Sequence, residues 1–166
     1  MDPRFPTGKF AFNPNPTPES RRDCIATIGS FPAELKAVMP TIGVDRPYRE
    51  GGWTARQVVH HVADSHMNAF VRFRLALTED KPTIKPYKEA EWAKLADSMT
   101  EDPAVSVQIL DGLHRRWHRM LTAMSDSDFL REAVHPDHGA MTLDWFLQLY
   151  AWHGRHHVAH LKLTAP

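Results

Sequence analysis

Apolar side chains recur at intervals of three and four residues along several stretches of the chain, which is the spacing of one face of an α-helix. One stretch begins at Thr54 and has the apolar positions Val59, Val62, Phe70, Phe73 and Leu77. Another begins at Pro103 and has the apolar positions Val105, Ile109, Leu113, Trp117, Met120 and Met124. The pattern therefore predicts two long helices, each with one face in a core.

Capping residues set the limits of these helices and predict another one. Thr54 and Gln57 have the spacing of a capping box, in which each side chain bonds the backbone of the other residue. Pro82 ends the helix that begins there, because proline cannot continue the hydrogen-bond ladder. Near the end of the chain, Thr142 is a suitable cap for a last helix that we expect over residues 142–163.

The remaining segments are less regular. Residues 19–39 suit a helix, but Gly29 and Pro32 predict a kink or break within it. A shorter helical piece is expected over residues 88–98, and the turn-forming sequence of 129–141 is typical of a short hairpin.

Four long helical segments without a sustained alternating strand pattern predict an all-α fold, a four-helix bundle. Prolines and phenylalanines are interleaved over residues 1–18, which predicts an extended Pro-rich N-terminal arm. A length of 166 residues is that of one ordinary domain, so we expect a single domain spanning 1–166.

Charge and composition exclude several classes of partner. Twenty basic residues balance twenty acidic ones, so no net charge attracts the chain to nucleic acid or to an anionic membrane. No stretch approaches the roughly eighteen apolar residues of a membrane span, and residues 1–16 lack the apolar segment of a secretion signal. We therefore expect a cytoplasmic protein with a small-molecule substrate.

Histidine is the unusual feature of the composition. Cys24 is the only cysteine, so zinc sites built on paired thiolates are excluded and a metal would need nitrogen or oxygen ligands. Nine of the eleven histidines fall within predicted helices: His60, His61, His66, His114, His118, His153, His156, His157 and His160.

His156 and His160 lie one turn apart on the last helix, in a row with Leu149, Trp152 and Leu163 that we expect to face inward. Two imidazoles at this spacing can bind one ion between them. The alternative interpretation is a pair of partly buried histidines that bond to neighbouring groups.

A third ligand would come from the helix that begins at Thr54. His66 lies in its apolar stripe, whereas His61 lies in a polar row with Ser65, Asn68 and Arg72. Periodicity alone does not choose between the two histidines. A polar row beside an apolar one is typical of a pocket wall, and this favours His61 as the third ligand. Asp64 is nearby and could orient a histidine that binds the metal.

Other histidine patterns indicate no second metal site. The His-Glu-x-x-His motif of metallopeptidases would need Glu where the chain has His157. A ferritin-like di-iron site would need two Glu-x-x-His elements, but the chain has only one, at 132–135, and it falls in an expected loop. His114 and His118 flank an apolar stripe, so we interpret them as a surface pair. His135 and His138 are expected to be turn residues.

The residues from Tyr48 to Asn68, with Arg72 after them, resemble the YfiT branch of the DinB-like superfamily, as do residues 150–160 and the turn at His135-Pro136-Asp137. This resemblance implies a four-helix bundle, one divalent metal on three histidines, metal-dependent hydrolase activity and a homodimer. It places the ligands at His61, His156 and His160. The chain ends at Pro166, where relatives continue the last helix, so the resemblance does not extend to a pocket wall or dimer contact made there.

Three imidazoles leave a tetrahedral ion with one open position, as in catalytic zinc sites. The resulting hypothesis is a metal-dependent hydrolase in which zinc or nickel activates a water nucleophile, with support from Asp64, Asn68 or Arg72. The alternative is an S-transferase that activates a low-molecular-weight thiol, and a third hypothesis is a bundle that binds metal without catalysis.

Overall fold

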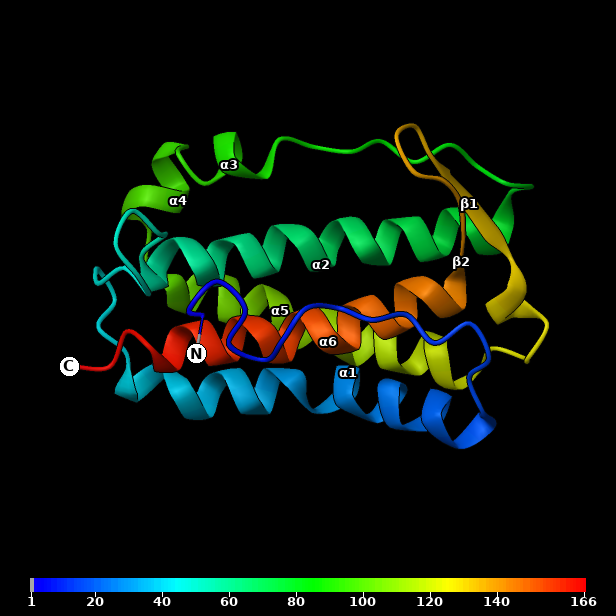
Figure 1. The fold of residues 1–166 in the computed structure, drawn as a ribbon, viewed down its shortest axis with the longest axis horizontal. Helices are drawn as coiled ribbons and strands as arrows, with labels where there is room; N and C mark the ends of the chain where they lie inside the picture. The colour runs from blue at the N-terminus through cyan, green and yellow to red at the C-terminus, as the bar shows by residue number, and fades with distance from the viewer. Residues whose placement is uncertain (1) are drawn as a thin grey trace.

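The computed structural model describes residues 2–166, and four long helices form its body. They are α1 (Pro18–Val38), α2 (Ala55–Thr78), α5 (Pro103–Thr122) and α6 (Leu143–Lys162). Each of α1 and α2 packs against both α5 and α6 (Figure 1). This arrangement confirms the predicted all-α four-helix bundle.

The first two long helices of the chain lie across one diagonal of the bundle, and the last two lie across the other. Because α1 and α2 both contact α5 and α6, α1 lies opposite α2 and α5 lies opposite α6. Figure 1 shows α1 and α6 running in one direction and α2 and α5 in the other. Parallel neighbours need long connections, and residues 79–102 return along the outside of the bundle to join α2 to α5.

Local capping explains where the helices begin. Thr54 accepts a hydrogen bond from the backbone N–H of Gln57, and the Gln57 side chain accepts one from the Thr54 N–H, so the predicted capping box is confirmed. Thr142 caps α6 by accepting a bond from the Trp145 N–H at 3.2 Å. Both caps were predicted because they depend on residues only three positions apart.

The predicted break in the first helix is wrong. Helix α1 is continuous from Pro18 to Val38, with Pro32 buried inside it. Proline has no backbone N–H, so the carbonyl of Ile28, four residues earlier, loses its usual donor within the helix. The ring nitrogen Nδ1 of His114 on α5 bonds that carbonyl instead, at 2.7 Å. A tertiary contact therefore satisfies the group that the proline leaves free.

Short elements connect the long helices: η1 (Met39–Thr41), α3 (Glu89–Trp92), α4 (Ala96–Thr100), η2 (Asp128–Leu130), β1 (Glu132–His135) and β2 (Gly139–Thr142). The expected single helix over 88–98 is two pieces, because Leu95 adopts an extended backbone conformation between them. The predicted hairpin is confirmed, since β1 and β2 pair antiparallel with Ala133 opposite Met141.

The apolar core has two parts with a layer of histidines between them. One part includes Phe73, Trp117 and Phe146, and the other includes Phe31 and Leu110. Three of the long helices contribute residues to both parts, and in each of them a histidine separates the two sets of residues. These histidines are His66 in α2, His114 in α5 and His153 in α6.

The buried face of α5 differs from the predicted one. Val105 and Ile109 are exposed, and the buried stripe passes instead through Val107, Leu110, His114, Trp117 and Leu121. This stripe has the same helical spacing, but it includes a histidine. The prediction is thus confirmed for Trp117 and, in part, for Leu113, Met120 and Met124, which pack against the core, and it is wrong for Val105 and Ile109, because it treated His114 as polar.

The N-terminal arm follows the length of α6 before it enters α1 (Figure 1). Phe10 packs against Trp145 and Trp152, with ring centroids 5.6 and 5.9 Å away. Asn13 and Gln148 exchange two hydrogen bonds, from the Asn13 N–H at 2.9 Å and to the Asn13 carbonyl at 3.0 Å. The arm thus covers one side of the last helix.

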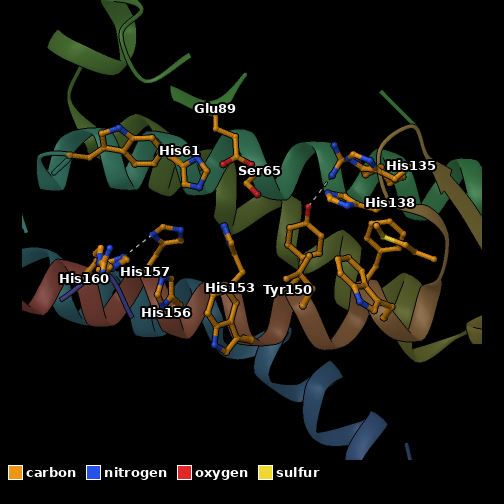
Figure 2. Close-up of a pocket in the computed structure, with 18 of the residues that line it drawn as sticks. His61, Ser65, Glu89, His135, His138, Tyr150, His153, His156, His157 and His160 are labelled. Atoms are coloured by element: carbon orange, nitrogen blue, oxygen red, sulfur yellow. Dashed lines mark hydrogen bonds between the residues drawn. The ribbon is translucent and has the colours of Figure 1, made fainter. Parts of the chain in front are cut away.

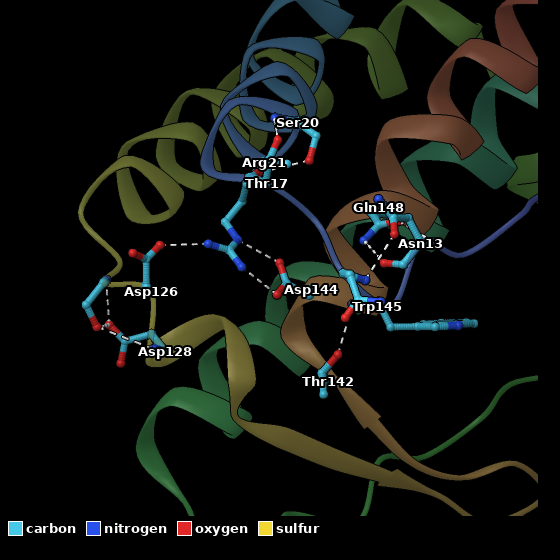
Figure 3. A network of polar contacts seen from close by, with 12 residues as sticks. Asn13, Thr17, Ser20, Arg21, Asp126, Asp128, Thr142, Asp144, Trp145 and Gln148 are labelled. Atoms are coloured by element: carbon cyan, nitrogen blue, oxygen red, sulfur yellow. Dashed lines mark hydrogen bonds and ion pairs between the residues drawn. The ribbon is translucent and has the colours of Figure 1, made fainter.

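An ion pair joins the beginning of α1 to the beginning of α6 (Figure 3). Arg21 donates two hydrogen bonds of 2.8 Å to the carboxylate of Asp144, and both side chains are nearly buried. The guanidinium also contacts the exposed Asp126. Among residues 2–166, no helix is both long enough and apolar enough to cross a bilayer.

Candidate metal centre

A cavity of about 440 Å³ lies between α2 and α6, and many polar side chains line it (Figure 2). Its lining residues come from α2, α6, the arm, the segments that flank α2 and the hairpin: Arg4, Tyr48, Trp53, His61, Ser65, Arg72, Glu89, His135, His138, Met141, Trp145, Phe146, Leu149, Tyr150, Trp152, His153, His156, His157 and His160.

Three histidines converge at one part of this cavity. His61 of α2 and His153 and His157 of α6 each offer a ring nitrogen, and the three nitrogens lie within 4.8 Å of one another. Figure 2 shows the ring of His61 facing the rings of the other two across the space between the helices. His153 and His157 are four residues apart, so they share one face of α6.

The His61 ring is held by its neighbours. Trp53, just before α2, packs on it with ring centroids 4.8 Å apart. The centroid of His157 lies 4.9 Å from that of His61, and the centroid of His153 lies 5.4 Å away. His61 is 6% exposed, so its position is fixed by packing rather than by solvent. This residue was predicted from the polar row on its helix.

His156 and His160 lie in the same cavity but are directed at the arm. Their ring centroids are 4.3 Å apart. His156 Nδ1 lies 3.2 Å from the hydroxyl of Thr7, and His160 Nε2 lies 3.1 Å from the carbonyl of Pro3. The structure thus brings the expected residues His61, His156 and His160 into one cavity, while the converging nitrogens belong to His61, His153 and His157.

The expectation that the row of His156 and His160 faces the core was incorrect for its outer members. Leu163 is 45% exposed, and Trp152 lies beneath the arm, where its ring nitrogen donates to the Gly8 carbonyl at 3.3 Å. The two histidines are buried because the arm covers them. Periodicity within α6 could not reveal this, since the covering segment is more than a hundred residues away in the chain.

Burial keeps the clustered histidines neutral. It lowers the pKa of His61 to about 4, with a smaller contribution from the charge of His160. Burial also lowers the pKa of His153 and of His157 well below its ordinary value. The pKa of His156 falls to about 4 for the same reason. Neutral rings at neutral pH leave nitrogen lone pairs available to a metal ion.

The three polar residues that were expected to support the site lie in different places. Arg72 lines the cavity and donates to the Tyr150 hydroxyl at 3.3 Å and to the Lys85 carbonyl at 3.2 Å. Asn68 donates to the backbone carbonyl of Asp64 at 2.9 Å. Among the described residues, neither Asn68 nor Asp64 lines the cavity. Burial raises the pKa of Asp64 to about 6, and the nearby Asp97 adds to the effect.

Two further pairs of histidines had been assigned to turns or to the surface. His135 and His138 lie at the hairpin turn, with ring centroids 4.5 Å apart, and they also line the cavity. The interpretation of His114 and His118 as a surface pair is wrong for His114, which is 1% exposed. His114 Nε2 lies 2.8 Å from His66 Nδ1 in the bundle centre.

His153 and His157 were not predicted to be members of the cluster. The signal was present, because these two residues are also separated by four positions. The converging set offers three neutral imidazole nitrogens from two packed helices, which is a donor set suited to zinc or nickel. The residues present therefore fit a divalent ion.

Comparisons with known proteins agree with this description. Residues 33–161 match the family model of the DinB superfamily. A Bacillus subtilis protein named "Putative metal-dependent hydrolase YfiT" is 45% identical over 161 residues, which cover 95% of this chain and 90% of that protein. A Bacillus cereus relative named in the same way is 48% identical over 163 residues, covering 96% of this chain and 94% of the relative.

A solved structure is also similar. It is described as YfiT from Bacillus subtilis, a probable metal-dependent hydrolase with an unusual four-helix bundle topology. The two folds superpose with a TM-score of 0.93 at 42% identity, and the match covers 97% of this chain and 94% of that one. The family match over most of the chain, the high identity and the shared fold together show that this chain belongs to the DinB superfamily.

Proposed function

We propose that this protein is a metal-dependent hydrolase of small molecules whose divalent ion, zinc or nickel, is bound by His61, His153 and His157. The observation that carries the proposal is the convergence of three ring nitrogens within 4.8 Å of one another in a cavity large enough for a small ligand. The names of the relatives support the reaction class.

His61, His153 and His157 would hold the ion, and a tetrahedral ion with three histidine ligands would have one coordination position for a further ligand. When bound, such an ion supplies Lewis-acid activation of a nucleophile. Neutral imidazole ligands leave its positive charge uncompensated, which favours this chemistry. His135 and His138 lie at the other part of the cavity, away from the three clustered histidines (Figure 2). Arg72, which donates to the Tyr150 hydroxyl, also lines the cavity, and these side chains can contact a polar or anionic group of the substrate.

The ligand set His61, His156 and His160 stays as the prediction from sequence, and it differs from the proposed set at two positions. Titration of the His153→Ala and His156→Ala variants with zinc compares the two ligand sets directly. The two variants are matched, because each replaces one histidine of α6 by alanine. We expect His153→Ala to lose stoichiometric zinc and His156→Ala to keep it. The opposite result would overturn the proposed ligands in favour of the sequence prediction.

An S-transferase that activates a low-molecular-weight thiol is the second candidate. Glu89 is the one carboxylate among the described residues of the cavity lining, and Figure 2 shows it beside Ser65. Attack by a thiolate needs less proton transfer than hydrolysis of an amide, so a cavity with a single carboxylate to serve as a general base favours this alternative.

Turnover assays distinguish the two reactions. Protein loaded with zinc or with nickel is tested against a panel of esters and amides, and separately against a low-molecular-weight thiol mixed with an electrophile. Hydrolysis that depends on His153 supports the first proposal. Thiol conjugation without hydrolysis replaces it with the second, and metal binding without either activity indicates a binding protein. Sedimentation of the same samples tests the homodimer that the family resemblance implies.

A further inference from the structure

Two hydrogen-bonded chains of histidines connect the candidate metal ligands to backbone carbonyls outside the site. The first begins at Ile28 in α1. Pro32 lacks the N–H that would bond the Ile28 carbonyl within the helix, so this oxygen is free to accept from another element. His114 Nδ1 lies 2.7 Å from it. Because a carbonyl oxygen only accepts, His114 Nδ1 must bear the proton.

The donor and acceptor roles then follow in order along the chain. A neutral imidazole has one N–H and one lone pair, so His114 Nε2 accepts. His66 Nδ1 lies 2.8 Å from that nitrogen and must donate to it. His66 Nε2 is consequently an acceptor, and His153 Nδ1, at 3.1 Å, must donate. The lone pair of His153 is therefore at Nε2, the nitrogen left for a ligand.

Burial supports this assignment of donors and acceptors, because it keeps the rings of His66 and His114 uncharged. Each is 1% exposed, and Phe31 packs against both, with ring centroids 5.1 and 5.0 Å away. Their described hydrogen-bond partners are other imidazoles and a carbonyl, and no carboxylate is among them. A protonated ring here would be a buried charge without a counter-ion, which is costly.

The second chain is shorter and begins in the arm. His160 Nε2 lies 3.1 Å from the Pro3 carbonyl and must donate to it. His160 Nδ1 is then an acceptor, and His157 Nδ1 lies 3.3 Å away. His157 Nδ1 therefore donates, and its lone pair is also at Nε2. The dashed line in Figure 2 marks this contact between the two rings.

We propose that the carbonyls of Ile28 and Pro3 fix the tautomers of His153 and His157 through His114, His66 and His160, so that both ligands present Nε2 to the metal. This inference rests on the proposed metal site. It assigns His66, His114 and His160 as positioning residues, and it gives the N-terminal arm a role in preparing the site.

In many metal sites, a carboxylate or a backbone carbonyl bonds directly to a histidine that binds the metal. This group accepts the histidine's other N–H, and it thereby sets the tautomer and the orientation of the ring. Here neutral histidines transmit the same restriction from a carbonyl to the ligand without adding negative charge. The ion would therefore keep more of its Lewis acidity than one surrounded by carboxylate partners.

Long-range ¹H–¹⁵N spectra of histidine-labelled, metal-free protein test the proposal directly, because they distinguish protonated from unprotonated ring nitrogens. We expect His66, His114 and His153 to be protonated at Nδ1, and His157 likewise, with His160 protonated at Nε2. A His153 ring protonated at Nε2 would overturn the first chain, and a His157 ring protonated at Nε2 would overturn the second.

Matched variants of His114 test its positioning role. In His114→Gln the amide can donate to the Ile28 carbonyl and accept from His66, so the chain is preserved. His114→Phe removes both bonds at similar size. We expect zinc affinity to fall by about tenfold to a hundredfold in His114→Phe and to recover in His114→Gln. His118→Phe, one turn along α5, is the control and should bind zinc like the original protein.

The result separates this inference from the proposed function. Zinc binding that requires His153 but is equal in His114→Phe and His114→Gln overturns the inference and leaves the proposed metal site intact. The expected tautomers in a protein that binds no zinc would confirm the two chains and overturn the metal site. If His114→Phe does not fold, the spectra of His114→Gln still decide, since the tautomer of His153 must be unchanged in it.

Discussion

Gly154 of α6 lies directly against the ring of Phe31 in α1. A Cβ atom at position 154 would be 2.7 Å from Phe31 Cδ2, which is closer than such atoms approach. The glycine thus allows α1 and α6 to pack closely at the level of the buried histidines. Phe31 in turn packs against His66 and His114, so this contact also sets the position of the histidine chain.

We predict that Gly154→Ala destabilises the protein by about 1–3 kcal/mol, because the added methyl group overpacks this contact. Gly112→Ala is the matched control. Gly112 lies in α5 with open space around its Cβ position, and alanine there should stabilise the helix by about 0.5–1 kcal/mol. Urea unfolding monitored by circular dichroism measures both changes, and equal effects of the two substitutions would contradict the packing argument.

The ion pair between Arg21 and Asp144 gives a second prediction. Asp144→Ala leaves the guanidinium nearly buried without its two-bond partner, so we expect a loss of about 3–5 kcal/mol in unfolding free energy. Asp126→Ala removes the exposed partner of the same arginine and should cost less than about 1 kcal/mol. A comparable loss of unfolding free energy in both variants would show that the burial of Asp144 does not determine the strength of this ion pair.

Metal should stabilise the fold without being required for it. Two apolar clusters occupy the bundle on either side of the histidines, so the metal-free chain should remain helical by circular dichroism after treatment with a chelator. Zinc at a hundredfold excess over its dissociation constant should add about 2.7 kcal/mol to the unfolding free energy. A chelated protein that is unfolded would refute this prediction.

The buried histidines predict a loss of stability in mild acid. Burial lowers the pKa of His114 to about 4 and that of His66 well below its ordinary value. As pH falls below about 6.5, the unfolded rings bind protons while the native rings do not, so the unfolded state is favoured. Each such ring can lower the unfolding free energy by about 1.4 kcal/mol per pH unit until the native ring also titrates.

Urea unfolding of metal-free protein at several values between about pH 7 and pH 5 measures this dependence. His114→Gln removes one titrating ring, so it should reduce the slope of unfolding free energy against pH by the contribution of one histidine. A slope in His114→Gln equal to that of the original protein would exclude His114 as a contributor.

The sequence by itself determined the local features of this protein. The capping box at Thr54 and Gln57, the cap at Thr142 and the hairpin at 129–141 depend on residues a few positions apart, and the structure confirms them. The period of apolar residues determined the four helices, because helix formation and the burial of one face are properties of neighbouring side chains. His61 could be chosen because its own helix has a polar row.

Only the tertiary structure decided which histidines face one another. On α6, the pairs His153 with His157 and His156 with His160 have the same spacing, and no local property separates them. The crossing of α2 directs the first pair at His61, and the N-terminal arm covers the second. The burial of His114 also depends on other helices. Histidine is a polar residue, but His114 can lie in the core because His66 of α2 and the Ile28 carbonyl of α1 supply its hydrogen-bond partners.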